Sequence, residues 1–205
     1  MKKIMFNDRY GLTDAVIEGR KTMTRRLIPD EFFGLTWDTR GNTLVYENEY
    51  GDFIDVRLSK YTRYKVGEIV AVAQNYFSTY DESKWENGIW YNEFADGSDI
   101  TNHAGWLNKM FVKAEYMPHQ IRITGIRCER LQDISDEDCF REGISESWYE
   151  STDTTTYGFT DEKKGTAVEF DTPREAFASL IDRVSGKGTW KKNPWVVAYE
   201  FELLK

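Results

Sequence analysis

The chain has 205 residues, with 35 Asp and Glu against 27 Lys and Arg, and a formal net charge of −8. Hydrophobic residues make up 40% of it and aromatic residues 15%, which excludes an intrinsically disordered chain and supplies enough apolar side chains for a core. No run approaches the roughly 18 apolar residues of a membrane span, and no long apolar run follows the first basic residues. We therefore expect one soluble, cytoplasmic domain that has no membrane partner.

The cysteines and histidines do not form a metal-binding pattern. Cys128 and Cys139 lack the close spacing of zinc ligands, and only His103 and His119 accompany them. We expect both cysteines to be reduced, as in a cytosolic protein. The sequence predicts no metal site and no organic cofactor.

The amino-terminal half contains one predicted helix and one buried strand. Residues 12–19 (LTDAVIEG) place apolar side chains on one face and end at Gly19, which suits a left-handed helix exit. Residues 69–73 (IVAVA) follow a turn at Gly67 and are continuously apolar. Such a run predicts a strand that is buried on both faces.

The carboxy-terminal half contains two predicted helices between two predicted strands. The apolar phase of residues 120–130 changes at Gly125, which predicts a β-bulge there. Residues 135–143 and 172–184 each begin with a capping residue and predict helices. Residues 195–203 alternate apolar and other side chains and predict a closing strand.

Two segments differ in composition from the rest of the chain. Residues 78–109 are polar and aromatic, with a predicted hairpin turn at Asn87 and Gly88. Residues 145–171 are rich in threonine and carry seven acidic residues against two lysines. We interpret both as insertions into a single domain spanning residues 1–205, the second as a loop or mobile hairpin.

Predicted strands outnumber predicted helices, and neighbouring strands are more frequent than alternating strand–helix units. This pattern favours an α+β domain built on an antiparallel or mixed, partly closed β-barrel with about three flanking helices.

The segment IEGRKTMTRR concentrates positive charge within an acidic chain. It holds one acid, Glu18, against four basic residues, Arg20, Lys21, Arg25 and Arg26. Guanidinium groups suit phosphate oxygens, so Arg25 and Arg26 are candidate phosphate contacts, and an internal salt bridge is the competing interpretation. Lys21 and Thr24 converge only if a turn brings them together. Otherwise Lys21 is a solvated surface residue and Thr24 bonds to the backbone.

Three segments in order resemble a known family. They are the Gly-x-Lys-x-x-Thr-Arg string from Gly19 to Arg25 with the KVGE turn at 65–68, the middle segment MPHQIRITGIRCERLQDISDEDCFREGI, and the ending GKGTWKKNPWVVAYEFELL. Together they resemble the ASCH family, whose domains have a PUA-like β-barrel. The chain is most similar to the longer ASCH proteins of phages and prophages, which would place it in the cytoplasm of a bacterial host.

The resemblance implies two kinds of function. PUA-like domains commonly bind RNA or modified bases, and some small ASCH proteins are amidohydrolases that remove the acyl group from acetylated cytidine. The family pattern makes Thr24 the nucleophile and Lys21 its activator, and expects a glutamate where this chain has Gln74. Glutamine keeps the shape and hydrogen-bonds, but it does not take up a proton or hold a cation by charge.

Further candidate ligand contacts combine amide, aromatic and basic side chains. Gln74 shares a strand face with two valines, so we expect it to point into the barrel, where its amide can bond to the edge of a base. Tyr76 is a candidate for base stacking, with ordinary packing as the alternative. Lys187 and Trp190 interleave positive charge with an aromatic ring, as in single-stranded nucleic-acid binding.

The leading functional hypothesis is a domain that binds RNA, or a modified nucleoside or nucleotide, in the barrel pocket. Its predicted contacts are Gly19, Lys21, Thr24, Arg25, Arg26, Gln74, Tyr76, Lys187 and Trp190. The first alternative is an amidohydrolase acting on acetylated cytidine through Lys21 and Thr24. The second is a phage interaction module that contacts a protein partner through the acidic insertion.

Overall fold

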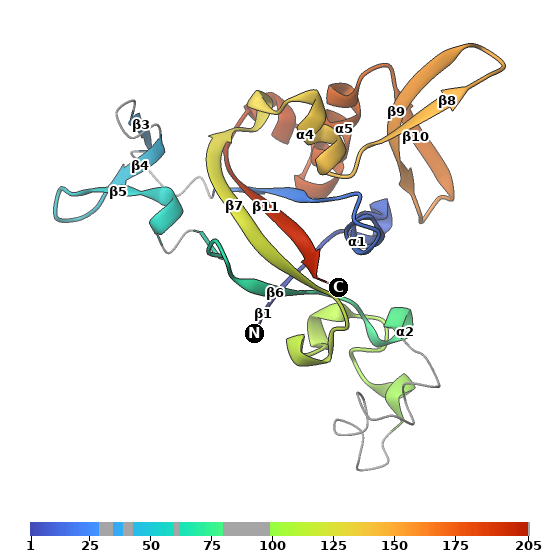
Figure 1. Cartoon of the computed structure of the whole chain (residues 1–205), viewed down its shortest axis with the longest axis horizontal. Coiled ribbons are helices and arrows are strands. Elements are labelled where there is room, and N and C mark those ends of the chain that lie inside the picture. Colours follow the sequence, from blue (N-terminus) through green and yellow to red (C-terminus); the bar gives the residue numbers. More distant parts are fainter. Residues whose placement is uncertain (29–34, 39–42, 60–61, 80–98, 205) are drawn as a thin grey trace.

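A mixed five-stranded sheet forms the centre of the molecule. The computed structural model describes residues 1–28, 35–38, 43–59, 62–79 and 99–204. The sheet order is β1 (Lys2–Ile4), β6 (Ile69–Val72), β7 (Gln120–Arg130), β11 (Trp195–Leu204) and β2 (Met23–Leu27) (Figure 1). β1 and β6 are parallel, and the other pairs are antiparallel. The predicted α+β class and mixed sheet are confirmed, and the described strands do not close into a complete barrel.

The three predicted helices are present, together with shorter helical turns. They are α1 (Leu12–Ile17), α4 (Asp136–Arg141) and α5 (Pro173–Ser185). The single turns α2 (Tyr76–Thr79) and α6 (Thr189–Lys192) bring the α-helices of the described residues to five. Four residues are too few to show a helical period, so neither turn was predictable. The 3₁₀ turns are η1 (Asp8–Tyr10), η2 (Val56–Leu58), η3 (Ile100–Asn102), η4 (Lys109–Phe111), η5 (Ala114–Tyr116) and η6 (Leu131–Asp133).

Capping residues set the helix ends as predicted. Ser135 accepts a hydrogen bond from the backbone N–H of Asp138 at the start of α4, and Thr172 caps α5 in the same way. Gly19 follows α1 with φ +77°, a backbone conformation that favours glycine. The chain therefore leaves α1 sharply and turns into β2.

The long strands β7 and β11 pair with one irregularity. Glu200 lies opposite Gly125 and Phe201 opposite Ile123, so Thr124 has no partner in the register. The predicted bulge at Gly125 is thereby confirmed. Bulges bend a strand and increase its twist, in keeping with the curvature of β7 in Figure 1.

Two small sheets flank the central one. The first has the order β3 (Thr36–Asp38), β4 (Thr43–Glu47) and β5 (Phe53–Asp55), and the ring of Trp37 stacks on Trp195 of β11 at 5.6 Å. The second has the order β10 (Thr166–Phe170), β9 (Thr154–Asp161) and β8 (Ser145–Tyr149). The acidic segment is thus a three-stranded antiparallel sheet, and the prediction of a loop or mobile hairpin was wrong.

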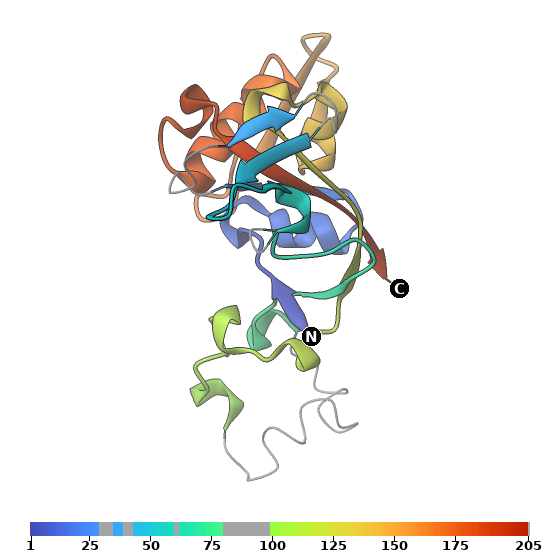
Figure 2. The ribbon, with the colours of Figure 1, turned by 90° about the vertical axis from the view of Figure 1, so that its left-hand side faces the viewer.

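The two hydrophobic clusters lie on different parts of the sheet. The larger joins the central sheet to α1, α4 and α5, and its most buried members include Ile4, Val16 and Leu131. The smaller joins the end of β6 to residues 100–117. Figure 2 shows these green residues at the end of the molecule opposite α5.

The predicted hairpin at Asn87 lies outside the described residues. No helix in the described part of the chain is both long enough and apolar enough to cross a membrane.

Both cysteines are free thiols inside the core. Burial raises the pKa of Cys128 and of Cys139 to about 12. Because the thiolate is the reactive form, we expect an aromatic disulfide reagent at about pH 8 to leave the folded protein unlabelled. Both thiols should react once the chain is unfolded in denaturant. Rapid labelling of the native protein, followed by absorbance, would show that one thiol is accessible.

Candidate ligand site around Lys21

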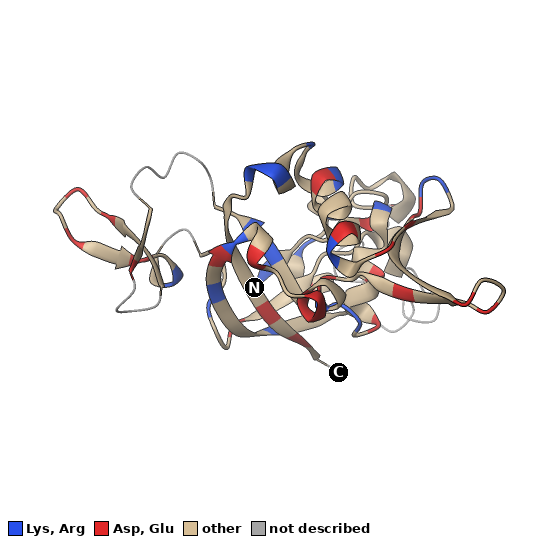
Figure 3. Cartoon of the chain, turned by 90° about the horizontal axis from the view of Figure 1, so that it is seen from above, with Lys and Arg blue, Asp and Glu red and all other residues tan. Residues whose placement is uncertain are grey.

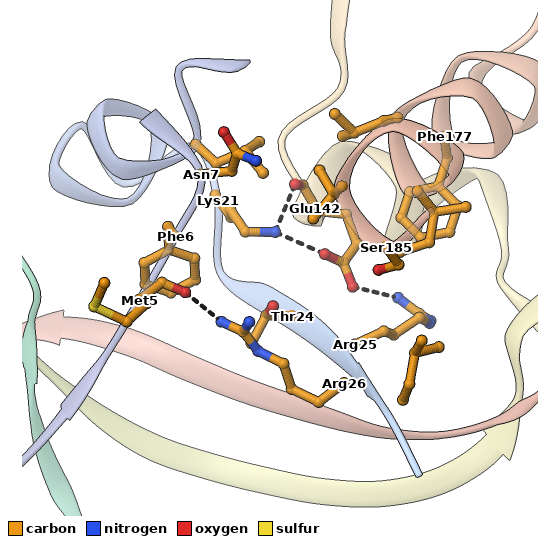
Figure 4. A pocket seen from close by; sticks show the side chains of 15 residues that line it. Met5, Phe6, Asn7, Lys21, Thr24, Arg25, Arg26, Glu142, Phe177 and Ser185 are labelled. Atoms are coloured by element: carbon orange, nitrogen blue, oxygen red, sulfur yellow. Dashed lines mark hydrogen bonds and ion pairs between the residues drawn. The ribbon is translucent and has the colours of Figure 1, made fainter. Parts of the chain in front are cut away.

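A pocket of about 280 Å³ lies where the start of β2 meets the residues that follow β1 and one face of α5 (Figure 4). Its polar lining includes the side chains of Asn7, Lys21, Thr24, Arg25, Arg26 and Glu142. Its apolar lining includes the side chains of Phe6, Leu12, Phe177, Leu180 and Ile181. Residues 21–26 of the basic segment and the carboxy-terminal helix α5 therefore meet at one concave site.

Lys21 is held at the pocket by α4. Its backbone N–H donates to the carbonyl of Ala15, which fixes the turn between α1 and β2. Its Nζ donates to the carbonyl and to the Oε2 of Glu142, both at 2.6 Å, and the side chain is only 2% exposed. Burial lowers the pKa of Lys21, and the Glu142 carboxylate opposes that shift without cancelling it.

Glu142 is the residue of this candidate site that the sequence did not indicate. It caps the carboxy-terminal end of α4, where a helix leaves carbonyl groups without partners and attracts cations. Gly143 follows with φ +105°, and a Cβ there would lie 3.1 Å from Leu12 and 3.6 Å from Lys21. The glycine stop was recognisable in the sequence, but nothing in the sequence connects the residue before it with Lys21.

Arg25 is fully engaged with acidic side chains. Its Nη2 lies 2.6 Å from Glu129 Oε1 and 2.7 Å from Asp138 Oδ2, and its Nη1 lies 3.1 Å from Glu142 Oε1. Burial alone would lower the pKa of Arg25, but these carboxylates raise it overall. Of the two interpretations of Arg25, the structure shows the internal salt bridge.

Arg25 and Lys21 belong to a larger cluster of ion pairs, named here the α4 cluster. Two further arginines, Arg127 and Arg141, contact Asp138, and each also contacts Glu200. The cluster contains four cations and four carboxylates: Lys21, Arg25, Arg127 and Arg141 with Glu129, Asp138, Glu142 and Glu200. Acids from β7, α4 and β11 thus neutralise much of the basic segment.

Arg26 differs from Arg25 because it faces the pocket without a carboxylate partner. Its Nη2 donates to the carbonyl of Met5 at 2.6 Å, and its guanidinium lies 5.8 Å from the centre of the Phe6 ring. It forms no ion pair with any described carboxylate. Burial lowers the pKa of Arg26. An arginine in a protein stays protonated, so this shift shows that a charge is buried without full compensation.

Thr24 presents an unused hydroxyl to the same pocket. The residue is 5% exposed, and its side chain makes no hydrogen bond to the described residues. In particular, no hydrogen bond joins its Oγ1 to Lys21 Nζ, which points to Glu142 instead (Figure 4). Lys21, Thr24 and Arg26 therefore share a pocket, with the Thr24 hydroxyl and Arg26 donors left for a ligand.

The structure does not bring Gln74 or Tyr76 to the Lys21 pocket. Gln74 lies just after β6, lines a separate pocket and contacts Nδ1 of His119 at 2.7 Å. Tyr76 is 1% exposed, and its ring packs edge-on against His103 at 5.4 Å. Of the two interpretations of Tyr76, the structure shows ordinary packing.

The remaining predicted contacts lie outside the pocket lining. Gly19 is exposed and shapes the helix exit, and Lys187 is exposed in the loop after α5. Trp190 packs edge-on against Phe177 at 6.1 Å, with the Arg174 guanidinium 5.2 Å from its ring. Lys187 and Trp190 therefore do not add a stacking surface to the Lys21 pocket.

The comparisons with known proteins do not extend this picture. A scan against protein-family models and searches of curated proteins and of solved structures found no match to this chain. Within the described residues, no group of three or more His, Cys, Asp or Glu side chains is arranged to hold a metal ion. The resemblance to the ASCH family remains a prediction from the sequence.

Proposed function

We propose that the Lys21 pocket binds a single nucleotide unit, free or as part of RNA, and that the chain is an ASCH-like, PUA-like reader in the bacterial cytoplasm. The supporting observation is Arg26, a largely buried cation with no described carboxylate partner that lines the pocket together with the Thr24 hydroxyl. Guanidinium and hydroxyl donors suit a phosphate or a base carbonyl. The apolar side of the pocket suits the face of a base or sugar.

The charge distribution favours a single unit over a long strand. Proteins that grip extended nucleic acid neutralise many phosphates with open basic side chains. Here Arg25 is paired internally, and Arg20 pairs with Glu18 at 2.6 Å. Figure 3 shows acidic positions interspersed with basic ones along the ribbon. Arg26, a pocket cation with no ion pair to a described carboxylate, fits one phosphate.

Calorimetric titration of the purified chain tests this proposal. The ligands are the four ribonucleoside 5′-monophosphates, acetylated cytidine and a short single-stranded RNA, each at about 50 mM and about 200 mM salt. Contact with one phosphate predicts a slope of log affinity against log salt of about −0.7. No binding of any nucleotide would refute the proposal. A slope of about −3 or steeper would mean that several phosphates are contacted, and would favour an extended RNA-binding surface over the pocket.

An amidohydrolase acting on acetylated cytidine is the second candidate, favoured by the position of Glu142. This residue supplies the Lys21 pocket with the carboxylate that Gln74 lacks. If Lys21 activates Thr24, it must first lose its proton, which its lowered pKa assists. We expect hydrolysis, followed by liquid chromatography, to increase with pH and level off below the ordinary lysine pKa of about 10.4. Activity that persists in Lys21→Met or Thr24→Val would exclude this mechanism.

A protein partner for the acidic segment stays a prediction. Of its seven acidic residues, Asp161 is buried against Arg9 at 2.8 Å, and the others are exposed on the β8–β10 sheet or next to it. Deleting the sheet would also remove the contacts of Phe159 and Asp161 with the domain. Charge-neutralising substitutions at the exposed acids are therefore a cleaner probe than deletion.

A further inference from the structure

A second pocket, of about 390 Å³, lies beyond the residues that follow β1. Met5, Phe6 and Asn7 line the Lys21 pocket, whereas Asp8 lines this one. Its lining also includes Thr13, Asp14 and Ile17 of α1, Gln74 after β6, and His119 before β7. We name it the Gln74 pocket.

Gln74 lines this pocket and carries an unused donor. The residue is 7% exposed, and its Oε1 lies 2.7 Å from Nδ1 of His119. Because an amide oxygen only accepts, Nδ1 carries the hydrogen, and the Gln74 oxygen is occupied. The amide nitrogen has no hydrogen-bond partner among the described residues. No buried side-chain nitrogen or oxygen of the described residues lacks a hydrogen bond, so solvent reaches this N–H, and a ligand acceptor can replace that solvent.

The two carboxylates of the pocket are not equivalent. Asp8 Oδ1 accepts from Thr13 Oγ1 and from Lys109 Nζ, both at 2.5 Å. Lys109 also donates to the carbonyl of Phe6 at 2.7 Å, so Asp8 is neutralised in place. Asp14 is exposed on α1 and makes no side-chain hydrogen bond or ion pair with the described residues. The pocket therefore offers one amide donor and one unpaired carboxylate.

We infer that the Gln74 pocket binds a guanine base, with Asp14 accepting from the N1 and N2 hydrogens and the Gln74 amide donating to O6. Guanine presents two neighbouring N–H donors next to a carbonyl acceptor on one edge. One carboxylate accepts both donors in a charge-assisted pair. Ile17 supplies an apolar contact for the ring face. Adenine lacks the carbonyl, and a guanidinium ion offers the donors but no acceptor for Gln74.

Titration with nucleosides, which lack phosphate, separates this site from the Lys21 pocket. We expect guanosine to bind the intact chain measurably. We expect inosine, which lacks the N2 amino group, to bind about tenfold more weakly or worse. Adenosine and guanidinium should not compete with guanosine. Equal binding of guanosine and adenosine, competition by guanidinium, or no guanosine binding would overturn the inference.

Two variants locate the site. Asp14→Asn on the exposed face of α1 and Gln74→Leu should each reduce guanosine affinity by about tenfold or more. Asp136→Asn on α4 is the matched control and should leave the affinity unchanged. A thermal melt of each variant separates lost binding from lost folding, and Asp14→Asn keeps the inference testable if Gln74→Leu unfolds. Full affinity in Asp14→Asn would contradict the site. The inference does not rest on the function proposed for the Lys21 pocket, and either can fail alone.

Discussion

Replacing Glu142 with glutamine is expected to lower the free energy of unfolding by about 3–5 kcal/mol, the usual cost of breaking a buried ion pair from one side. Glu142 contacts Lys21 at 2.6 Å and Arg25 at 3.1 Å, and all three side chains are at most 6% exposed. Glutamine retains hydrogen bonding but leaves two buried cations short of one negative charge. Urea unfolding followed by circular dichroism measures the change.

Glu137→Gln provides the matched control. Glu137 lies on the same helix α4, but it is exposed and forms no ion pair with the described residues. Its expected contribution to stability is the attraction between an acidic side chain and the first turn of a helix. The free energy of unfolding should therefore fall by less than about 1 kcal/mol in this variant. Similar losses in the two variants would show that the α4 cluster does not stabilise the fold as its geometry indicates.

Replacing Arg26 with methionine is expected to weaken nucleotide binding by roughly 10- to 150-fold, which corresponds to the loss of a charged hydrogen bond of about 1.5–3 kcal/mol. The same change should leave stability unchanged or increase it. The lowered pKa of Arg26 shows that its burial is only partly compensated, and methionine fills a similar volume without a charge. Calorimetric titration and urea unfolding measure the two effects.

Arg20→Met tests whether the Arg26 effect is specific. Arg20 is exposed, its one ion pair among the described residues is with Glu18, and it does not line the pocket. Arg20→Met removes the same charge from the same segment as Arg26→Met. Because the Arg20 ion pair is exposed, the substitution should change neither affinity nor stability appreciably. If the two variants weakened binding equally, the effect would be one of general charge, and Arg26 would not be a ligand contact. A stability gain accompanied by lost binding is the expected pattern for a functional residue.

Local signals in the sequence predicted the local structure well. The phase change at Gly125, the caps at Ser135 and Thr172, and the left-handed exit at Gly19 all depend on neighbouring residues, and each is found as predicted. The prediction of a loop or mobile hairpin for the acidic segment was wrong. Four of its threonines, which as β-branched residues favour strands, lie in β9.

The site depends on contacts between distant residues, and these were only partly predictable. The spacing of Lys21 and Thr24 left open whether they converge, and both line one pocket. The spacing did not reveal that Glu142, far along the chain, would hold Lys21, or that Arg25 and Arg26 would face different environments. Neighbouring residues on a strand point to opposite faces, so two adjacent arginines have different surroundings. Which face carries the acids is decided by tertiary packing.

A nitrogen-15 NMR titration that follows the Nε–H signals of the arginines tests the central proposal most directly. The probe is an equimolar mixture of the four ribonucleoside 5′-monophosphates. We predict a saturable shift of the Arg26 signal and little change at Arg25, whose donors are already paired. An unchanged Arg26 signal together with a shift of the Trp190 indole would contradict the proposal and move nucleotide binding to the loop after α5.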